Sequence, residues 1–248
     1  MKITFIGTSH GVPTKERFCS SAMIEAGNNI YIIDAGAPLA DELARMGRAV
    51  TDVKHVFFTH SHSDHTVGVL QLMSLANWFY RDARITLHCP EKALAEVCTQ
   101  WMIANNEAHG LREGLDCSVY EEGLVFEDEY ISVSAIANKH LANGRSFGFL
   151  VTDLKSGKRI LFTGDMSKKL SGEDFPRIAL EEELDAVVSE LAHFEMKHVK
   201  PYLEQCRAKA VYFNHVAPLS KLEEIRGING AYPFSVVALE DGDEIVLE

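Results

Sequence analysis

The chain has 248 residues, 46% of them hydrophobic, and a formal net charge of −12 at pH 7. This length suits one large domain with a substantial core, so we predict a single domain over residues 1–248. The acidic balance argues against non-specific binding of nucleic acid, and the sequence has no run of about 18 apolar residues that would span a membrane.

Five cysteines are scattered singly along the chain. Their odd number and the absence of paired spacing argue against a disulfide framework and against a thiolate metal site. The apolar run at the N-terminus is short and gives way to polar residues and glycine, which is not typical of a signal peptide. We therefore expect a cytoplasmic protein.

Hydrophobic periodicity predicts strands and helices in turn through the first half of the chain. A hairpin is expected around Gly27 and Asn28, and Pro38 and Gly47 bracket a short helix. Residues 105–117 lack a regular pattern. The expected strands cover residues 2–6, 21–26, 29–33, 55–58 and 85–88, and the expected helices cover 38–46, 67–79 and 91–103.

Short apolar runs between turn residues continue through the second half. The polar run over residues 166–183 is interpreted as a loop or lid, and residues 196–206 as a helix. Strands outnumber helices, and helices follow strands in both halves, which favours an α+β fold of two packed sheets with helices outside. The expected strands cover residues 118–120, 124–126, 131–136, 147–151, 159–162, 186–188, 211–213, 234–239 and 244–247.

A cluster of three imidazoles and one carboxylate follows the apolar run at residues 56–58, which predicts a buried strand. Residues two apart in an extended loop point the same way, so His60 and His62 are placed to bind one ion. Asp64 and His65 come where the chain turns into a helix, which aims them at a second ion. Imidazole and carboxylate are the ligands that zinc and iron favour. The alternative is a polar loop that is rich in histidine and binds no metal.

Three further candidate ligands lie where later apolar runs stop. His140 lies in the loop after strand 131–136, Asp165 follows residues 161–164, and His215 follows residues 211–214. Each of them taken alone is more simply explained as a solvated loop residue. Two ions bound at residues 60–65 would, however, need further ligands from elsewhere in the chain. We therefore predict one metal site at His60, His62 and His140.

The second predicted site consists of Asp64, His65 and His215. Asp165 has two carboxylate oxygens and is predicted to bridge the two ions.

These motifs resemble the metallo-β-lactamase superfamily, and within it the branch of RNase Z and the PhnP-type phosphodiesterases. The superfamily motif HxHxDH corresponds to residues 60–65, and the branch's opening segment FLGTGxGxPxxxR resembles residues 5–17. The likeness spans nearly the whole chain. Further matching elements are YIIDAG at residues 31–36, SFGF at 146–149, the GD motif at 164–165 and Asn214-His215.

The resemblance implies an αββα metallo-β-lactamase sandwich, with two mixed β-sheets flanked by helices. It also implies two divalent metal ions at one edge, with zinc expected first and manganese or iron as alternatives. Asp64 is expected to act in catalysis as well as in metal binding. Asp34 is expected to hydrogen-bond a ligand imidazole rather than to coordinate a metal.

Further site residues follow from the same resemblance. Glu190 matches a glutamate of the branch that orients a histidine acting as proton donor. His198 is our first choice for that donor, and His193 is the competitor because it is nearer to Glu190 in sequence. Ser146 and His10 are predicted to contact substrate, Ser146 from the SFGF element and His10 from the rim of the pocket.

The leading functional hypothesis is a dinuclear metal-dependent hydrolase, most simply a phosphodiesterase for a small anionic phosphodiester or nucleotide. The alternatives are RNase Z-like tRNA 3′ processing, lactone or thioester hydrolysis, and a metal-binding sensor without catalysis. Binding of tRNA is disfavoured, because one expected hairpin fills the segment from His140 to Asp165 where an RNase Z exosite arm would be inserted. A homodimer is a further expectation.

Overall fold

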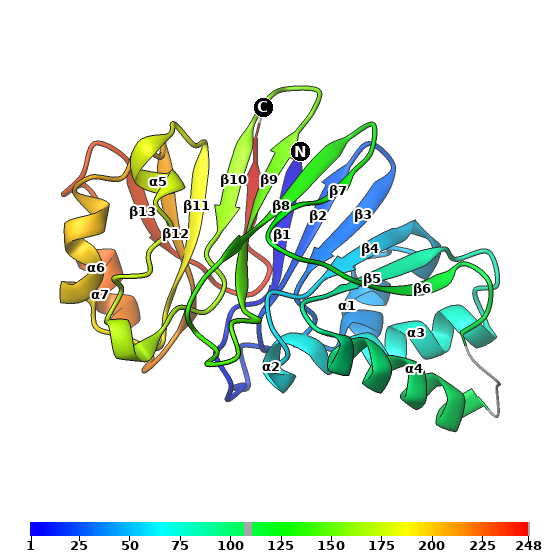
Figure 1. Cartoon of the computed structure of the whole chain (residues 1–248). Helices are drawn as coiled ribbons and strands as arrows, with labels where there is room; N and C mark the ends of the chain where they lie inside the picture. The colour runs from blue at the N-terminus through cyan, green and yellow to red at the C-terminus, as the bar shows by residue number, and fades with distance from the viewer. Residues whose placement is uncertain (107–110, 248) are drawn as a thin grey trace. The chain divides into compact units, whose positions relative to one another are not determined.

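The computed structural model describes residues 1–106 and 111–247, and the chain divides into two compact units. The N-terminal unit consists of Met1–Gly7, Gly11–Glu121 and Asp241–Val246. The C-terminal unit is built mainly from Glu122–Glu240, together with Thr8–His10. Each unit contains one seven-stranded sheet (Figure 1). The single domain expected over residues 1–248 stays a prediction.

The sheet of the N-terminal unit is mixed. Its strand order is β14-β1-β2-β3-β4-β5-β6, with antiparallel pairs from β14 to β3 and parallel pairs from β3 to β6. The parallel strands therefore have their carboxyl ends on one edge. The strands are β1 (Lys2–Gly7), β2 (Ser21–Ala26), β3 (Asn29–Ile33), β4 (Val53–Phe57), β5 (Ile85–Cys89), β6 (Leu115–Val119) and β14 (Glu244–Val246).

Helices cover this sheet through their apolar faces (Figure 1). Leu39 and Leu43 of α1 and Leu72 of α3 are fully buried in one core with Val56 of β4 and Leu87 of β5. Burying each of these side chains contributes roughly 2 kcal/mol to folding. The helices are α1 (Leu39–Arg45), α2 (Ser63–Thr66), α3 (Val69–Trp78) and α4 (Lys92–Asn106), and a short 3₁₀ turn, η1, spans Val50–Asp52.

The sheet of the C-terminal unit repeats the mixed pattern. Its order is β13-β12-β11-β10-β9-β8-β7, with antiparallel pairs from β7 to β10 and parallel pairs from β10 to β13. The strands are β7 (Gly123–Glu127), β8 (Ile131–Ala137), β9 (Phe147–Asp153), β10 (Arg159–Phe162), β11 (Ala186–Leu191), β12 (Ala210–Val216) and β13 (Ser235–Ala238). The helical segments are η2 (Lys168–Leu170), α5 (Ile178–Glu181), α6 (Met196–Leu203) and α7 (Lys221–Gly227).

The predicted fold class is confirmed, because two mixed sheets are flanked by helices. Two local predictions are wrong, and one helix was missed. Strand β6 begins at Leu115 inside the segment expected to be irregular, of which residues 107–110 lie outside the described chain. The expected loop over residues 166–183 contains η2 and α5. Helix α7 was not predicted, because charged residues dominate it and only Leu222 and Ile225 are apolar.

No helix in the described parts of the chain combines the length and the apolar composition needed to cross a membrane.

Candidate metal centre

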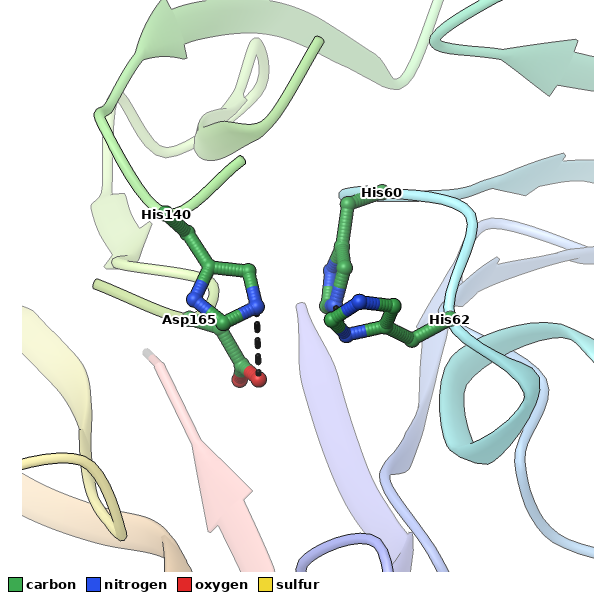
Figure 2. A group of neighbouring side chains, drawn as sticks. All are labelled: His60, His62, His140 and Asp165. Carbon is green, nitrogen blue, oxygen red and sulfur yellow. Dashed lines mark hydrogen bonds and ion pairs between the residues drawn. The ribbon is translucent and has the colours of Figure 1, made fainter. Parts of the chain in front are cut away.

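The loop after β4 brings two imidazoles together in the N-terminal unit. His60 is fully buried and His62 is exposed, and His60 Nε2 lies 2.9 Å from His62 Nδ1. Figure 2 shows the two rings close together on this loop. Their planes meet at an angle of 75°. Two ring nitrogens at this distance share one proton in a hydrogen bond. The side chains of residues 60 and 62 therefore point the same way, as their spacing predicted.

Asp34 fixes the protonation pattern of this loop from the end of β3. Its carboxylate accepts hydrogen bonds from the Thr59 backbone N–H at 2.8 Å and from the Thr59 hydroxyl at 2.9 Å. Because that hydroxyl donates to Asp34, its oxygen accepts from His60 Nδ1, 3.0 Å away. The His60 tautomer therefore carries its proton on Nδ1 and leaves a lone pair on Nε2, the form that binds metal.

His65 is oriented by the same carboxylate. Its Nδ1 lies 2.8 Å from Asp34 Oδ2, which can only accept a hydrogen bond while ionised. The other ring nitrogen, Nε2, then carries the lone pair and lies 3.5 Å from Asp64 Oδ2. The hydrogen bond expected between Asp34 and an imidazole is thus present, and one aspartate orients two predicted ligands.

Close backbone packing holds Asp34 and the metal-binding turn together. The Ala35 N–H donates to the His65 carbonyl at 2.6 Å, and a Cβ added at Gly36 would lie 1.8 Å from the Asp64 carbonyl oxygen. Only glycine therefore fits at position 36. Asp34 has a φ of 58°, a conformation that is uncommon for a non-glycine residue and that recurs at functional sites.

The C-terminal unit surrounds one buried carboxylate with three imidazoles. His140 Nε2 lies 3.8 Å from Asp165 Oδ2, His193 Nε2 lies 3.9 Å from the same oxygen, and His215 Nδ1 lies 3.5 Å from Oδ1. Figure 2 marks the first of these pairs with a dashed line. These separations are too long for good hydrogen bonds. They are close to the roughly 3.4 Å between two ligands that each lie about 2.0–2.1 Å from one tetrahedral ion.

The bonds of the outer ring nitrogens orient two of these imidazoles. His140 Nδ1 lies 3.2 Å from the Met166 carbonyl oxygen, which has no proton to give, so Nδ1 is the donor. His193 Nδ1 lies 2.9 Å from Glu190 Oε1 and donates to that carboxylate. In both rings the nitrogen that faces Asp165 is therefore available as a ligand.

His215 is aimed by an irregularity in β12. Glu190 pairs with Asn214 and Leu191 with Val216, so His215 is the extra residue of a β-bulge between β11 and β12. Its φ is 49°, in the left-handed region. A bulge changes the direction of one side chain without ending the strand. This explains why β12 continues to Val216, although the apolar run that predicted it stops at Phe213.

Glu190 accepts four hydrogen bonds in the C-terminal unit. Besides His193 Nδ1, its carboxylate accepts the backbone N–H groups of Met166 at 2.9 Å, Ala192 at 2.7 Å and His193 at 3.1 Å. Only 3% of Glu190 is exposed. Glu190 therefore joins the loop that carries Asp165 to the loop that carries His193. These hydrogen bonds offset the cost of burying its carboxylate.

The structure brings His193, and not His198, to Glu190. His198 Nδ1 instead accepts the Glu195 backbone N–H at 3.2 Å, at the start of α6. The carboxylate partner expected for His198 thus belongs to His193. The nitrogens of His193 and His215 and a carboxylate oxygen of Asp165 all lie within 4.8 Å of one another, so His193 is also a candidate ligand. The sequence pointed to His193 only as an acid, through its nearness to Glu190.

The two residues predicted to contact substrate occupy different environments. His10 is partly exposed, and its ring lies edge-on to His215 with centroids 6.3 Å apart. Ser146 is 1% exposed, and its hydroxyl oxygen accepts the Leu141 N–H at 3.1 Å. Ser146 thus braces the loop that carries His140, and contact of either residue with substrate stays a prediction.

Comparisons with known proteins agree with the predicted resemblance. The Ribonuclease Z of Listeria monocytogenes serotype 4b (strain CLIP80459) is 28% identical over 156 residues, which is 62% of this chain and 49% of that enzyme. The Ribonuclease Z of Pseudomonas putida (strain GB-1) is 31% identical over 179 residues, covering 71% and 53%. The chain spans about half the length of the curated relatives it matches.

Solved structures share the fold at low identity. Human tRNase Z, short form, superposes with a TM-score of 0.76 at 19% identity over 100% of both chains. The metallo-beta-lactamase fold protein YhfI from Bacillus subtilis gives 0.76 at 14% identity over 98% of both chains. The chain therefore has the metallo-β-lactamase fold. A family model described as Anti-Pycsar protein Apyc1 matches residues 1–215, so the chain belongs to the Apyc1 family.

Proposed function

We propose that this protein is a dinuclear metal-dependent hydrolase that cleaves a small phosphodiester or nucleotide. The observation that carries the proposal is the hydrogen bonding of the outer ring nitrogens of the histidines. His60 and His65 in one unit and His140 in the other each donate a proton outward, to Thr59, Asp34 and the Met166 carbonyl. Each therefore keeps a lone pair on the nitrogen next to the other predicted ligands, which suits cation binding and not a hydrogen-bonded core.

We further propose that both sets serve one centre. Neither set alone supplies the roughly seven ligands that two ions need. The centre would be held by His60, His62, Asp64, His65, His140, Asp165 and His215, with zinc as the first candidate and manganese or iron as alternatives. Divalent ions held there would lower the pKa of a coordinated water and would neutralise the charge of a phosphate.

The chain's own residues perform the remaining chemistry. Cleavage of a phosphodiester leaves an alkoxide, which needs a proton in the transition state. We assign that donation to His193 Nε2, because Glu190 holds Nδ1 at 2.9 Å and stabilises the positive charge of a doubly protonated ring. The proton passes to the leaving oxygen and the ring returns to its neutral form. His198 is the alternative donor and lacks this carboxylate.

The chain between His140, in the loop after β8, and Asp165, in the loop after β10, bears on the size of the substrate. From His140 to Asp165 the residues form one loop, β9, a turn and β10, so no arm for tRNA is inserted there. Processing of tRNA 3′ ends is the second candidate, because the curated relatives are named Ribonuclease Z. A metal-binding sensor is the non-enzymatic alternative. The expected homodimer stays a prediction, which light scattering can test.

The test is a substrate screen of the metal-loaded protein. We expect cleavage of bis(p-nitrophenyl) phosphate and of cyclic or linear nucleotide diesters, and slower cleavage of pre-tRNA, lactones and β-lactams. Activity should disappear with a chelator and return with zinc or manganese. Specific trimming of a tRNA 3′ end at a higher kcat/KM would favour the second candidate. Tight metal binding without turnover of any substrate would favour the sensor.

A further inference from the structure

A hollow of about 560 Å³ opens beside His140 within the C-terminal unit. One wall is the loop after β8 and the other is η2 with the residue before it. Its size lies within the roughly 300–1,000 Å³ of small-molecule sites. The residues that matter here are Lys139, His140 and Leu141 on the first wall and Lys168, Lys169 and Leu170 on the second.

The charge of this hollow is opposite to that of the protein. The chain carries 36 acidic and 24 basic residues, yet the hollow is lined by three lysines and by no acidic residue. All three lysines are exposed, and within the described parts of the chain their ammonium groups form no ion pair. Cations gathered in this way around a concave surface attract an anion and raise its local concentration.

The walls are held in place without using the lysine side chains. Asp174 Oδ2 accepts the Ser167 backbone N–H at 2.8 Å and the Lys139 backbone N–H at 3.3 Å, so one carboxylate oxygen joins both walls. The His140 N–H donates to Asn138 Oδ1 at 3.2 Å. The backbone of the hollow is therefore organised before any ligand binds, which lowers the entropic cost of binding.

We propose that this hollow binds a second phosphate group of the substrate, next to the phosphodiester that is cleaved. The inference rests on the proposed function and names the substrate class more closely: a nucleotide diester that carries a further phosphate. His140 forms part of both the wall and the predicted metal centre, which puts the two anionic groups in adjacent subsites. Leu141 and Leu170 offer apolar surface to the body of the nucleotide.

The test compares two substrates that differ by one phosphate: thymidine 5′-(p-nitrophenyl phosphate) with and without a 3′-phosphate. We expect the wild type to prefer the 3′-phosphorylated substrate. The triple variant Lys139→Gln, Lys168→Gln, Lys169→Gln should lose about tenfold or more in kcat/KM on that substrate, mostly through KM, and less than about threefold on the other. The control is Lys155→Gln, an exposed lysine of the same unit whose ammonium group lies 4.4 Å from the Tyr130 ring centroid. It should leave both values unchanged.

Equal losses on both substrates, or no loss on either, would overturn the second-phosphate subsite while leaving the hydrolase intact. If the wild type cleaves neither substrate, the proposed function fails, and calorimetry then decides the subsite separately. In that case adenosine 3′,5′-bisphosphate should bind the wild type at least about tenfold more tightly than adenosine 5′-monophosphate, and the triple variant should lose the difference. Equal affinities in the wild type would contradict the inference.

Discussion

The two units hold their candidate ligands in different ways. In the N-terminal unit, His60 and His62 lie on the loop after β4, and Asp64 and His65 follow at once in the short helix α2. In the C-terminal unit, His140, Asp165, His193 and His215 come from β8, β10, β11 and β12 or from the loops that follow them. The first set is local in sequence, whereas the second exists only because parallel strands bring their carboxyl ends to one edge.

Despite this difference, the two sets have one feature in common. Each depends on a buried carboxylate from a neighbouring strand end, and that carboxylate orients the set without being one of the predicted ligands. Asp34 at the end of β3 orients His65 directly and His60 through Thr59. Glu190 of β11 holds His193 and the backbone of Met166. A histidine motif therefore identifies the donors, while these carboxylates determine which nitrogen of each ring is available.

The largest effect is expected from the centre of the scattered set. Asp165→Ala removes the carboxylate that three imidazoles face, so metal and activity should be lost together. The loss should exceed the roughly 10–100-fold typical of residues that only orient ligands. Elemental analysis of protein purified without chelator tests the metal content, and circular dichroism checks the fold. Full metal occupancy in this variant would show that Asp165 is not a ligand.

The next prediction separates the two candidate acids. His193→Ala should lose about 10²–10⁴-fold in turnover on a diester with a poor leaving group and much less when p-nitrophenolate leaves. His198→Ala is the matched control, since that ring bonds only the start of α6 in the described contacts, and should stay near wild type on both substrates. If His193→Ala also loses metal, the residue is a ligand. A leaving-group effect in His198→Ala alone would reverse the assignment.

The contrast between the sets also explains what the sequence could predict. The motif at residues 60–65 specifies its ligands by spacing, and the strand ends carrying His140 and Asp165 follow from apolar runs. The bulge that aims His215 leaves no trace in hydrophobic periodicity, because it depends on the register between β11 and β12. The partner of Glu190 depends on the turn after Leu191, where the backbone N–H groups of Ala192 and His193 wrap around its carboxylate. Sequence distance alone left His193 and His198 as alternatives.

A smaller effect is expected at Asp34, which tests whether orientation matters in the local set. Asp34→Asn keeps the shape of the side chain but cannot accept on both amide atoms, so His65 and Thr59 compete for one oxygen. Metal affinity should fall about 10–100-fold, as is usual when the partner of a ligand histidine is removed. Thr59→Val removes the hydroxyl that joins Asp34 to His60 but leaves the bond between Asp34 and His65, so it should cost less. A competition titration with a chromophoric chelator measures the metal affinity of both variants. An unchanged affinity in Asp34→Asn would show that the histidines at residues 60–65 do not need Asp34 for their orientation.

The smallest effect concerns the stability of the N-terminal unit in acid. Burial, and then the nearby His55, lower the pKa of His88 from 6.5 to about 3. The ring stacks on Phe57 with centroids 4.4 Å apart, and its nitrogens contact Ser118 Oγ at 3.1 Å and His55 Nδ1 at 3.0 Å. The unfolded chain binds a proton at this residue below pH 6.5, whereas the folded chain does so only near pH 3.

The contribution of His88 to stability is therefore present above pH 6.5 and is lost as the pH falls towards 3. Between pH 7 and pH 5 this amounts to about 2 kcal/mol of unfolding free energy. His88→Gln removes the titrating group, so its stability should be lower at pH 7 but should decline less steeply with acid than that of the wild type. Urea unfolding at both pH values measures the slopes. Parallel declines in wild type and His88→Gln would show that His88 is not a source of acid sensitivity.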